Sequence, residues 1–357
     1  MKNRFKGLPR TTVSNSITYG IVILAYVVLL ILQNGGLMSK SLQGQLVPIC
    51  AYVVMAISLN LTVGVMGELS LGHAGFMSVG AYTAVTAAVC LRQGGMGDVG
   101  TLIISMIIGG IFAGITSLVV VVPVLRLQGD YLAIVTLAFG EIIRNLIQCS
   151  YIGLDENGLH FSMSSEAALE LSETGTTILR GPMGAVGIPR LSSLTAGFVL
   201  IMITLVVVLN LINSHSGRAI MSLRDNRIAA ESIGISPVKY KIMAFVTSAV
   251  LAGMAGGLYA MNFSSILAKK FDFNTSILVL VFVVLGGMGN IRGSIIAAAA
   301  LTVLPELLRS VADYRMLVYA VVLIAVMLIS NSPYVMMFLA QLRRKIRKRK
   351  EAKDRGN

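Results

Sequence analysis

The sequence predicts an all-α fold: a polytopic bundle of about ten membrane segments (8–10), formed by one transmembrane domain over residues 1–357. Hydrophobic residues make up 55% of the chain and charged residues only 13%, with a mean hydropathy of +0.82, unlike a soluble domain. The apolar residues are gathered in runs of about 20, the length that crosses a bilayer. Lysines and arginines cluster between and beyond these runs, as topology signals do.

The apolar runs give the expected order of the membrane segments. We expect spans near residues 17–33, 46–66, 71–91, 101–125, 131–149, 194–213, 242–261, 276–290, 291–308 and 314–331. The first follows a basic segment that resembles the start of a signal peptide, but it has no small-residue cleavage site after it, so we expect it to be retained. The eighth and ninth are short, and they form either two full crossings or a re-entrant pair.

The distribution of basic residues predicts the orientation. An even number of spans places both termini on one side, and the basic N-terminus and the basic tail 341–357 indicate the cytoplasm. The connection 150–193 is then extracytoplasmic and acidic, whereas 214–241 is cytoplasmic and basic. Lys269 and Lys270 fall on the outer side, against the trend. The net charge of +13 therefore reflects membrane topology, and we expect contact with membrane lipid and none with nucleic acid.

The sequence lacks the usual signatures of a cofactor site. The phosphate-binding pattern GxxxxGK[ST] occurs nowhere, so ATP would have to be bound by another subunit. The three histidines are scattered without the spacing of metal ligands, so no metal site is expected. We therefore expect no catalytic residues and no cofactor bound by this chain, which is not an enzyme by itself.

Several polar residues lie within predicted spans, where a charge is costly unless it is paired or faces a cavity. The candidates for a translocation path are Asn60, Glu68, His73, Glu141 and Arg144. Glu141 and Arg144 stand three residues apart, so they form either a structural ion pair or part of a substrate path. His73 lies among small residues and is either a hydrogen-bonded packing residue or a path residue.

Two glycine-rich stretches interrupt the apolar runs. They read GVMGELSLGHAGFMSVG at 64–80 and LGGMGNIRGS at 285–294. Discontinuous spans expose helix ends and free backbone groups, by which many transporters hold polar substrates. Close packing of helices through small residues is the other interpretation, and the two do not exclude each other.

The inner connection contains a polar helix. The run GRAIMSLRDNRIAAESIG at 217–234 predicts one helix with an Arg227 to Glu231 pair and an end at Gly234. The serine before Pro237 is the expected N-cap of the next helix, with Pro237 as its first residue. Such a short helix is marginal alone in water. It is expected either to dock into a groove on a soluble partner or to lie on anionic lipid.

The segment AAESIGISPVKYK resembles the EAA-type coupling loop of bacterial ABC importer permeases, which inserts into the ATPase subunit. The resemblance implies that the ATPase-coupling residues are Ala229, Ala230, Glu231, Gly234 and Pro237. The order here is Ala-Ala-Glu where the family has Glu-Ala-Ala, so the match is offset at Glu231, whereas Gly234 matches the family glycine.

Three longer segments, at 58–84, 126–144 and 218–260, resemble the LivM-type permease subunits of branched-chain amino acid ABC importers, and the likeness runs over 46–308. It implies a second homologous permease subunit, two ABC ATPase subunits that use ATP and Mg, and an extracytoplasmic solute-binding protein in a bacterial cell membrane. Leucine, isoleucine and valine are the expected substrates, with urea, amides or other amino acids as alternatives. An ion-coupled secondary transporter is the alternative of another class.

Overall fold

The computed structural model describes residues 10–35, 38–124, 129–155, 158–172 and 175–307, and residues 320, 321, 324 and 328. The chain divides into two compact units, Met1–Thr302 and Val303–Asn357, and nearly all described residues belong to the first. The predicted tail 341–357 lies outside the described residues, as does the predicted span 314–331 apart from the four isolated positions.

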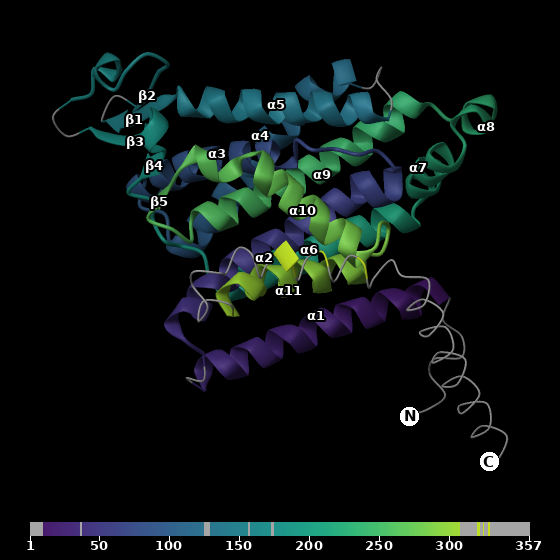
Figure 1. The fold of residues 1–357 in the computed structure, drawn as a ribbon. Coiled ribbons are helices and arrows are strands. Elements are labelled where there is room, and N and C mark those ends of the chain that lie inside the picture. The colour runs from purple at the N-terminus through teal and green to yellow at the C-terminus, as the bar shows by residue number, and fades with distance from the viewer. Residues whose placement is uncertain are drawn as a thin grey trace. The chain divides into compact units, whose positions relative to one another are not determined.

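Helices form most of the first unit (Figure 1), which confirms the predicted helical membrane bundle. The long helices are α1 (Arg10–Asn34), α2 (Lys40–Asn60), α3 (His73–Gln93), α4 (Asp98–Val124), α5 (Asp130–Gln148), α6 (Leu194–Asn213) and α9 (Pro237–Ala260). Within the described residues, seven helices are long and apolar enough to cross a membrane, and they overlap the first seven predicted spans. About ten crossings and the cytoplasmic termini stay predictions.

The next two helices are shorter. Helix α10 (Phe273–Gly286) has 14 residues and α11 (Ile291–Leu307) has 17, with the last turns of α11 in the second unit. At 1.5 Å per residue α10 is about 21 Å long, less than the thickness of the hydrocarbon core. Helix α10 is therefore too short to cross the hydrocarbon core by itself.

Small residues let the central helices approach closely. Helices α3, α4 and α9 pack against one another around Gly80, Gly109 and Gly253, and a Cβ atom added at Gly80 would overlap the backbone of Gly253. An added Cβ at Gly256 of α9 would likewise overlap the Met77 carbonyl of α3. Packing of backbone against backbone is how helices associate without a hydrophobic driving force in lipid.

A small sheet lies at one end of the helices (Figure 1). The prediction of a fold made of helices alone was wrong in this region. Its strands are β1 (Tyr151–Asp155), β2 (Gly158–Ser162), β3 (Thr176–Arg180), β4 (Ala185–Val186) and β5 (Ser265–Ile266). They are antiparallel in the order β2-β1-β3-β4-β5. Strand β5 comes from the connection between α9 and α10, so the sheet joins two distant segments of the chain. Each strand has only two to five residues, which is too short for the alternating pattern of a strand to be recognised in the sequence.

Two short helices, α7 (His215–Asp225) and α8 (Arg227–Ser232), lie at the opposite end from the strands. Helix α7 packs against α6, α9 and the π-helix η1 (Leu61–Met66), which continues α2. The predicted inner and outer connections therefore occupy opposite ends of the helices.

Candidate functional site

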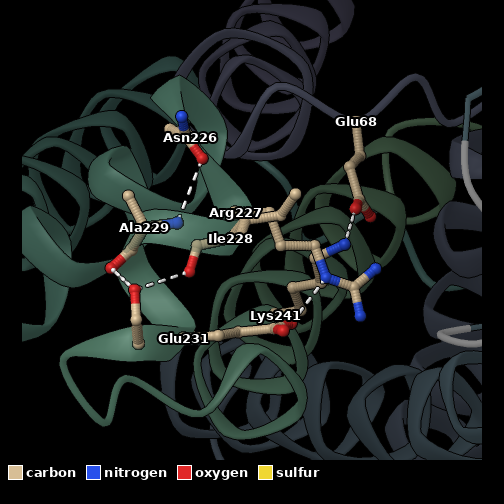
Figure 2. Close-up of polar contacts among 8 residues, drawn as sticks. Glu68, Asn226, Arg227, Ile228, Ala229, Glu231 and Lys241 are labelled. Carbon is tan, nitrogen blue, oxygen red and sulfur yellow. Dashed lines mark hydrogen bonds and ion pairs between the residues drawn. The ribbon is translucent and has the colours of Figure 1, made fainter.

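The predicted coupling loop contains two helices where the sequence predicted one. Asn226 has an extended backbone (φ −155°, ψ 104°), which ends α7. Its side chain then caps α8, because Asn226 Oδ1 accepts a hydrogen bond from the Ala229 amide at 3.1 Å (Figure 2). Asparagine competes with helix continuation through such local bonds. The prediction of one unbroken helix over 217–234 was wrong at this residue.

The predicted helix end at Gly234 is confirmed. Gly234 has φ of +85°, its amide donates to the Glu231 carbonyl at 3.0 Å, and the Ile235 amide donates to the Ala230 carbonyl at 3.1 Å. This pair of bonds is a Schellman motif, which satisfies the last carbonyls of a helix and needs a left-handed residue. Helix α9 then begins at Pro237 as predicted, although the Ser236 side chain makes no capping hydrogen bond.

Helix α8 presents apolar side chains to the outside. Ile228 is 82% exposed and Ile233 is 76% exposed, whereas Ala230 is buried. Arg227 Nε lies 2.7 Å from Glu231 Oε1, as the spacing predicted (Figure 2). A helix of six residues with caps at both ends and two exposed isoleucines is a small, fixed apolar surface.

The two glycine-rich stretches are real breaks, and they interlock. The first is η1, which ends at Gly67 with φ of +79°, and the second joins α10 to α11. Asn60 bridges them, because its Oδ1 accepts from the Gly289 amide at 2.8 Å and its Nδ2 donates to Ser294 Oγ at 2.8 Å. An added Cβ at Gly64 would overlap Gly289 N. Both interpretations of the glycines, discontinuous spans and close packing, therefore hold here.

Glu68 follows the first break and forms an ion pair with Lys241 near the start of α9 (Figure 2). The two side chains are 16% and 10% exposed. Sequence reasoning singled out the glutamate and missed its partner. A signal was available, because a buried carboxylate needs a cation and Lys241 stands at the edge of an apolar run.

His73 is buried at the beginning of α3. Its Nε2 lies 2.8 Å from Ser58 Oγ of α2, and the neighbouring Ala74 amide donates to Ser276 Oγ of α10 at 3.2 Å. The imidazole is only 2% exposed. These contacts describe a hydrogen-bonded packing residue, and a role for His73 in a translocation path stays a prediction.

Glu141 and Arg144 form the predicted pair on α5, with Arg144 Nη2 2.7 Å from Glu141 Oε2. The other carboxylate oxygen accepts from the Phe273 amide at 3.2 Å. Phe273 is the first residue of α10, and a carboxylate at a helix N-terminus is favoured by the unpaired amides and the helix dipole. The pair thus ties α5 to α10.

The five path candidates do not meet around one site. They form four separate sets of contacts, centred on Asn60, Glu68, His73 and the Glu141 pair. Asn60 and His73 are buried inside the subunit. Over the described ranges, no three His, Cys, Asp or Glu residues are grouped so that they could hold a metal ion.

A cavity of about 850 Å³ lies at the end of the helices that carries the strands. Val89 and Gln93 from α3 form part of its wall, and Glu166, Glu170 and Arg180 place charges of both signs in it. Arg180 Nε lies 3.5 Å from Glu166 Oε1. Sequence reasoning missed this cavity, because its lining comes from segments that only the sheet brings together.

Comparison with known proteins identifies the family. A family described as branched-chain amino acid transport system / permease component matches residues 41–329. The high-affinity branched-chain amino acid transport system permease protein LivM of Escherichia coli K12 is 36% identical over 286 residues, which cover 78% of this chain. Its counterpart of the same name in Salmonella typhimurium LT2 is 35% identical over 290 residues, again 78% of this chain.

A more distant relative is the probable branched-chain amino acid transport permease protein LivM of Methanocaldococcus jannaschii. It is 24% identical over 272 residues, 68% of this chain and 74% of that protein. No solved structure is significantly similar to the chain.

The match spans 66% of the length of the E. coli and Salmonella relatives. The family match includes both glycine-rich breaks, the five path candidates and the loop that carries α8. Together with seven membrane-capable helices among the described residues, it makes the chain a multi-pass protein of the inner membrane. The chain belongs to the family of permease components of branched-chain amino acid transport systems.

Proposed function

We propose that the chain is the membrane-spanning permease subunit of an ATP-driven ABC importer that moves leucine, isoleucine and valine into the cell. The similarity to the two bacterial LivM proteins over 78% of the chain carries this proposal. The breaks at Gly64 and Gly289 support it, because transporters place discontinuous helices where a substrate path opens and closes.

Helix α8 is the proposed contact with the ATPase subunits. Its caps at Asn226 and Gly234 fix a helix that would be marginal alone, and Ile228 and Ile233 supply an apolar surface for a groove. A helix that rests on anionic lipid carries a strongly basic face. On α8, Arg227 is neutralised by Glu231, which favours a protein partner.

Two such ATPase subunits would use ATP and Mg, so this chain needs no cofactor and is not an enzyme by itself. The loop 214–241 faces the cytoplasm in this proposal, because the ATPases lie there. The same orientation places the strands and the charged cavity outside, where they serve to receive a solute-binding protein.

A second homologous permease subunit completes the proposed path. Asn60 and His73 are enclosed by their own subunit, so a path that runs between two subunits requires less rearrangement than one through the middle of this chain. Helices α1 and α4 expose many large apolar side chains, as lipid-facing or subunit-facing helices do.

The energy source provides the main test. In proteoliposomes that contain the full transporter, uptake of radiolabelled leucine requires ATP, and replacing the phosphate-binding lysine of the ATPase subunits abolishes it. Ionophores that collapse ion gradients leave uptake unchanged. Uptake that persisted with the inactive ATPase and disappeared with the ionophores would instead establish a secondary transporter.

The substrate is tested separately in the same vesicles. Unlabelled isoleucine and valine compete with leucine, whereas urea and acetamide do not. Competition by urea or acetamide alone would assign the same machinery to the alternative substrates, without changing the conclusion on the energy source.

A further inference from the structure

Arg224 connects the proposed coupling loop with the first membrane break. It lies in the last turn of α7, and its Nη1 donates a hydrogen bond to the Gly64 carbonyl of η1 at 3.1 Å, across 160 residues of sequence. The aliphatic part of the side chain packs on Gly67, where an added Cβ would overlap Arg224 Cγ. Arg224 therefore contacts both the π-helix and the left-handed residue that ends it.

The guanidinium group also contacts Asp225, the last residue of α7. Asp225 Oδ1 accepts from Arg224 Nε at 3.0 Å and from Nη2 at 2.9 Å. Asn226, the cap of α8, follows directly in the chain. Because arginine presents several donors in a rigid plane, one side chain holds the Asp225 carboxylate and the Gly64 carbonyl at once.

From Gly64 the contacts continue to the second break. The backbone of Gly64 lies against Gly289, whose amide is held by Asn60 Oδ1 at 2.8 Å. Asn60 Nδ2 also donates to Ser294 Oγ at 2.8 Å, at the beginning of α11. Hydrogen bonds and close contacts thus run from Arg224, two residues before the cap of α8, to α11 by way of Gly64 and Asn60.

We propose that Arg224 is a positioning residue that transmits displacement of α8 to the two interlocked breaks. This inference rests on the proposed function, in which the ATPases move α8. The breaks interrupt the regular helical backbone, so they deform more easily than the unbroken helices around them. Without the Arg224 bond, the packing between α7 and η1 would be looser, so displacement of α7 and α8 would move η1 less.

The first experiment measures the number of leucine molecules taken up per ATP hydrolysed by the reconstituted transporter. Arg224→Ala should lower this ratio by about tenfold, within the range of ordinary coupling between sites, while ATP hydrolysis stays within about twofold because α8 is unaltered. Arg224→Lys should recover part of the ratio, since its ammonium group still donates to a carbonyl. The matched control is Arg218→Ala, because Arg218 lies on the same helix but hydrogen-bonds to the nearby His215 and the Asn213 carbonyl.

The second experiment does not depend on transport. Hydrogen exchange of the purified complex should become faster in Arg224→Ala at residues 61–67 and also at 286–294, whereas Arg218→Ala should resemble the wild type. An unchanged uptake ratio in Arg224→Ala, or faster exchange confined to α7 and α8, would overturn the inference. Absence of ATP-dependent uptake in the wild type would overturn the proposed function itself, so the two failures are distinguishable.

Discussion

At the scale of single residues, every charge singled out within a predicted span has a partner. Glu68 pairs with Lys241 and Glu141 pairs with Arg144, and Glu141 also meets the first amide of α10. A charge in hydrocarbon is tolerated only when it is paired or solvated. The structure shows pairing, which explains how these side chains persist in an apolar bundle before any role in transport is considered.

The Glu68 to Lys241 pair gives a prediction on stability. Glu68→Ala or Lys241→Ala leaves one charge unpaired in a mostly buried place, so each should lower the free energy of unfolding by about 1.5–3 kcal/mol, the range for a charged hydrogen bond. The exchange Glu68→Lys with Lys241→Glu should restore most of the loss. Thermal unfolding of the purified subunit in detergent measures these differences.

The exposed pair on α8 is the control for this experiment. Arg227→Ala removes an i, i+4 pair in which both side chains are more than 40% exposed, and such pairs contribute only about 0.3–0.5 kcal/mol. If the swapped Glu68 and Lys241 pair were no more stable than the single variants, the native orientation of the pair, rather than its attraction, would hold the segment after η1 to α9.

At the scale of elements, α8 is stabilised by the caps at its two ends more than by the residues between them. Six residues form too few hydrogen bonds to be stable alone. Asn226 supplies an acceptor at the start, and Gly234 supplies the left-handed backbone at the end. The helix therefore depends on the two residues that cap it.

Gly234→Val should uncouple ATP hydrolysis from leucine uptake while the subunit stays in the membrane. A left-handed backbone costs a residue with a side chain about 1–2 kcal/mol, and this strain falls on the Schellman motif that ends α8. Nothing lies within 4 Å of an added Cβ there, so the effect is one of backbone strain rather than of collision. Uptake and hydrolysis in proteoliposomes provide the measurement.

Gly95→Val is the matched control, because Gly95 has φ of +77° and also has open space around it, but it lies in the turn between α3 and α4. It should leave coupling unchanged. Gly234→Asn should also retain coupling, since asparagine tolerates the left-handed region. Normal coupled uptake in Gly234→Val would contradict the assignment of α8 as the docking helix.

At the scale of the whole described bundle, the two ends of the helices carry different structures. The strands and the charged cavity lie at one end, and α7 and α8 lie at the other together with η1 (Figure 1). The interlocked breaks are thus on the side of the proposed ATPase contact. Such an arrangement suits an importer in which cytoplasmic motion first reaches the inner part of the path.

The orientation is testable with introduced cysteines in a background that has Cys90 and Cys149 replaced by serine and retains only the buried Cys50. A membrane-impermeant maleimide should label Met163→Cys in intact cells, because Met163 follows β2 and is 53% exposed. In cells that lack the ATPase subunits, Ile228→Cys on α8 should react only after the membrane is permeabilised, because Ile228 is 82% exposed when α8 is undocked. Labelling of Ile228→Cys from outside would reverse the predicted topology.

Much of the helical framework follows from composition and run length. Long apolar segments in a chain with few charges leave few alternatives in a bilayer, since helices satisfy their own backbone bonds. The five strands are different, because each has only two to five residues and gains its stability from pairing with a segment distant in sequence. The helix break at Asn226 was not predicted, because an asparagine can occur within a helix as well as at its N-cap.

The candidate residues were partly recognisable from local signals. Gly234 and Pro237 follow local rules of helix ends, so their structural roles were predictable. Lys241 and Arg224 were not recognised as partners of the broken segment, because their contacts with Glu68 and Gly64 span more than 150 residues. The spacing of residues along the chain does not show which residues so far apart in sequence come into contact.

A helical membrane protein with two glycine-rich breaks, a basic polar loop and a resemblance to a permease family could be predicted from the amino-acid sequence alone. Those features depend on local composition, on helix-end chemistry and on shared motifs. The packed bundle was needed to show that the breaks at Gly64 and Gly289 meet, that Asn60 bridges them, and that Arg224 connects them to the loop. The reason is physical: these contacts form between backbone groups freed by the breaks, and their partners come from helices that meet only when the bundle packs.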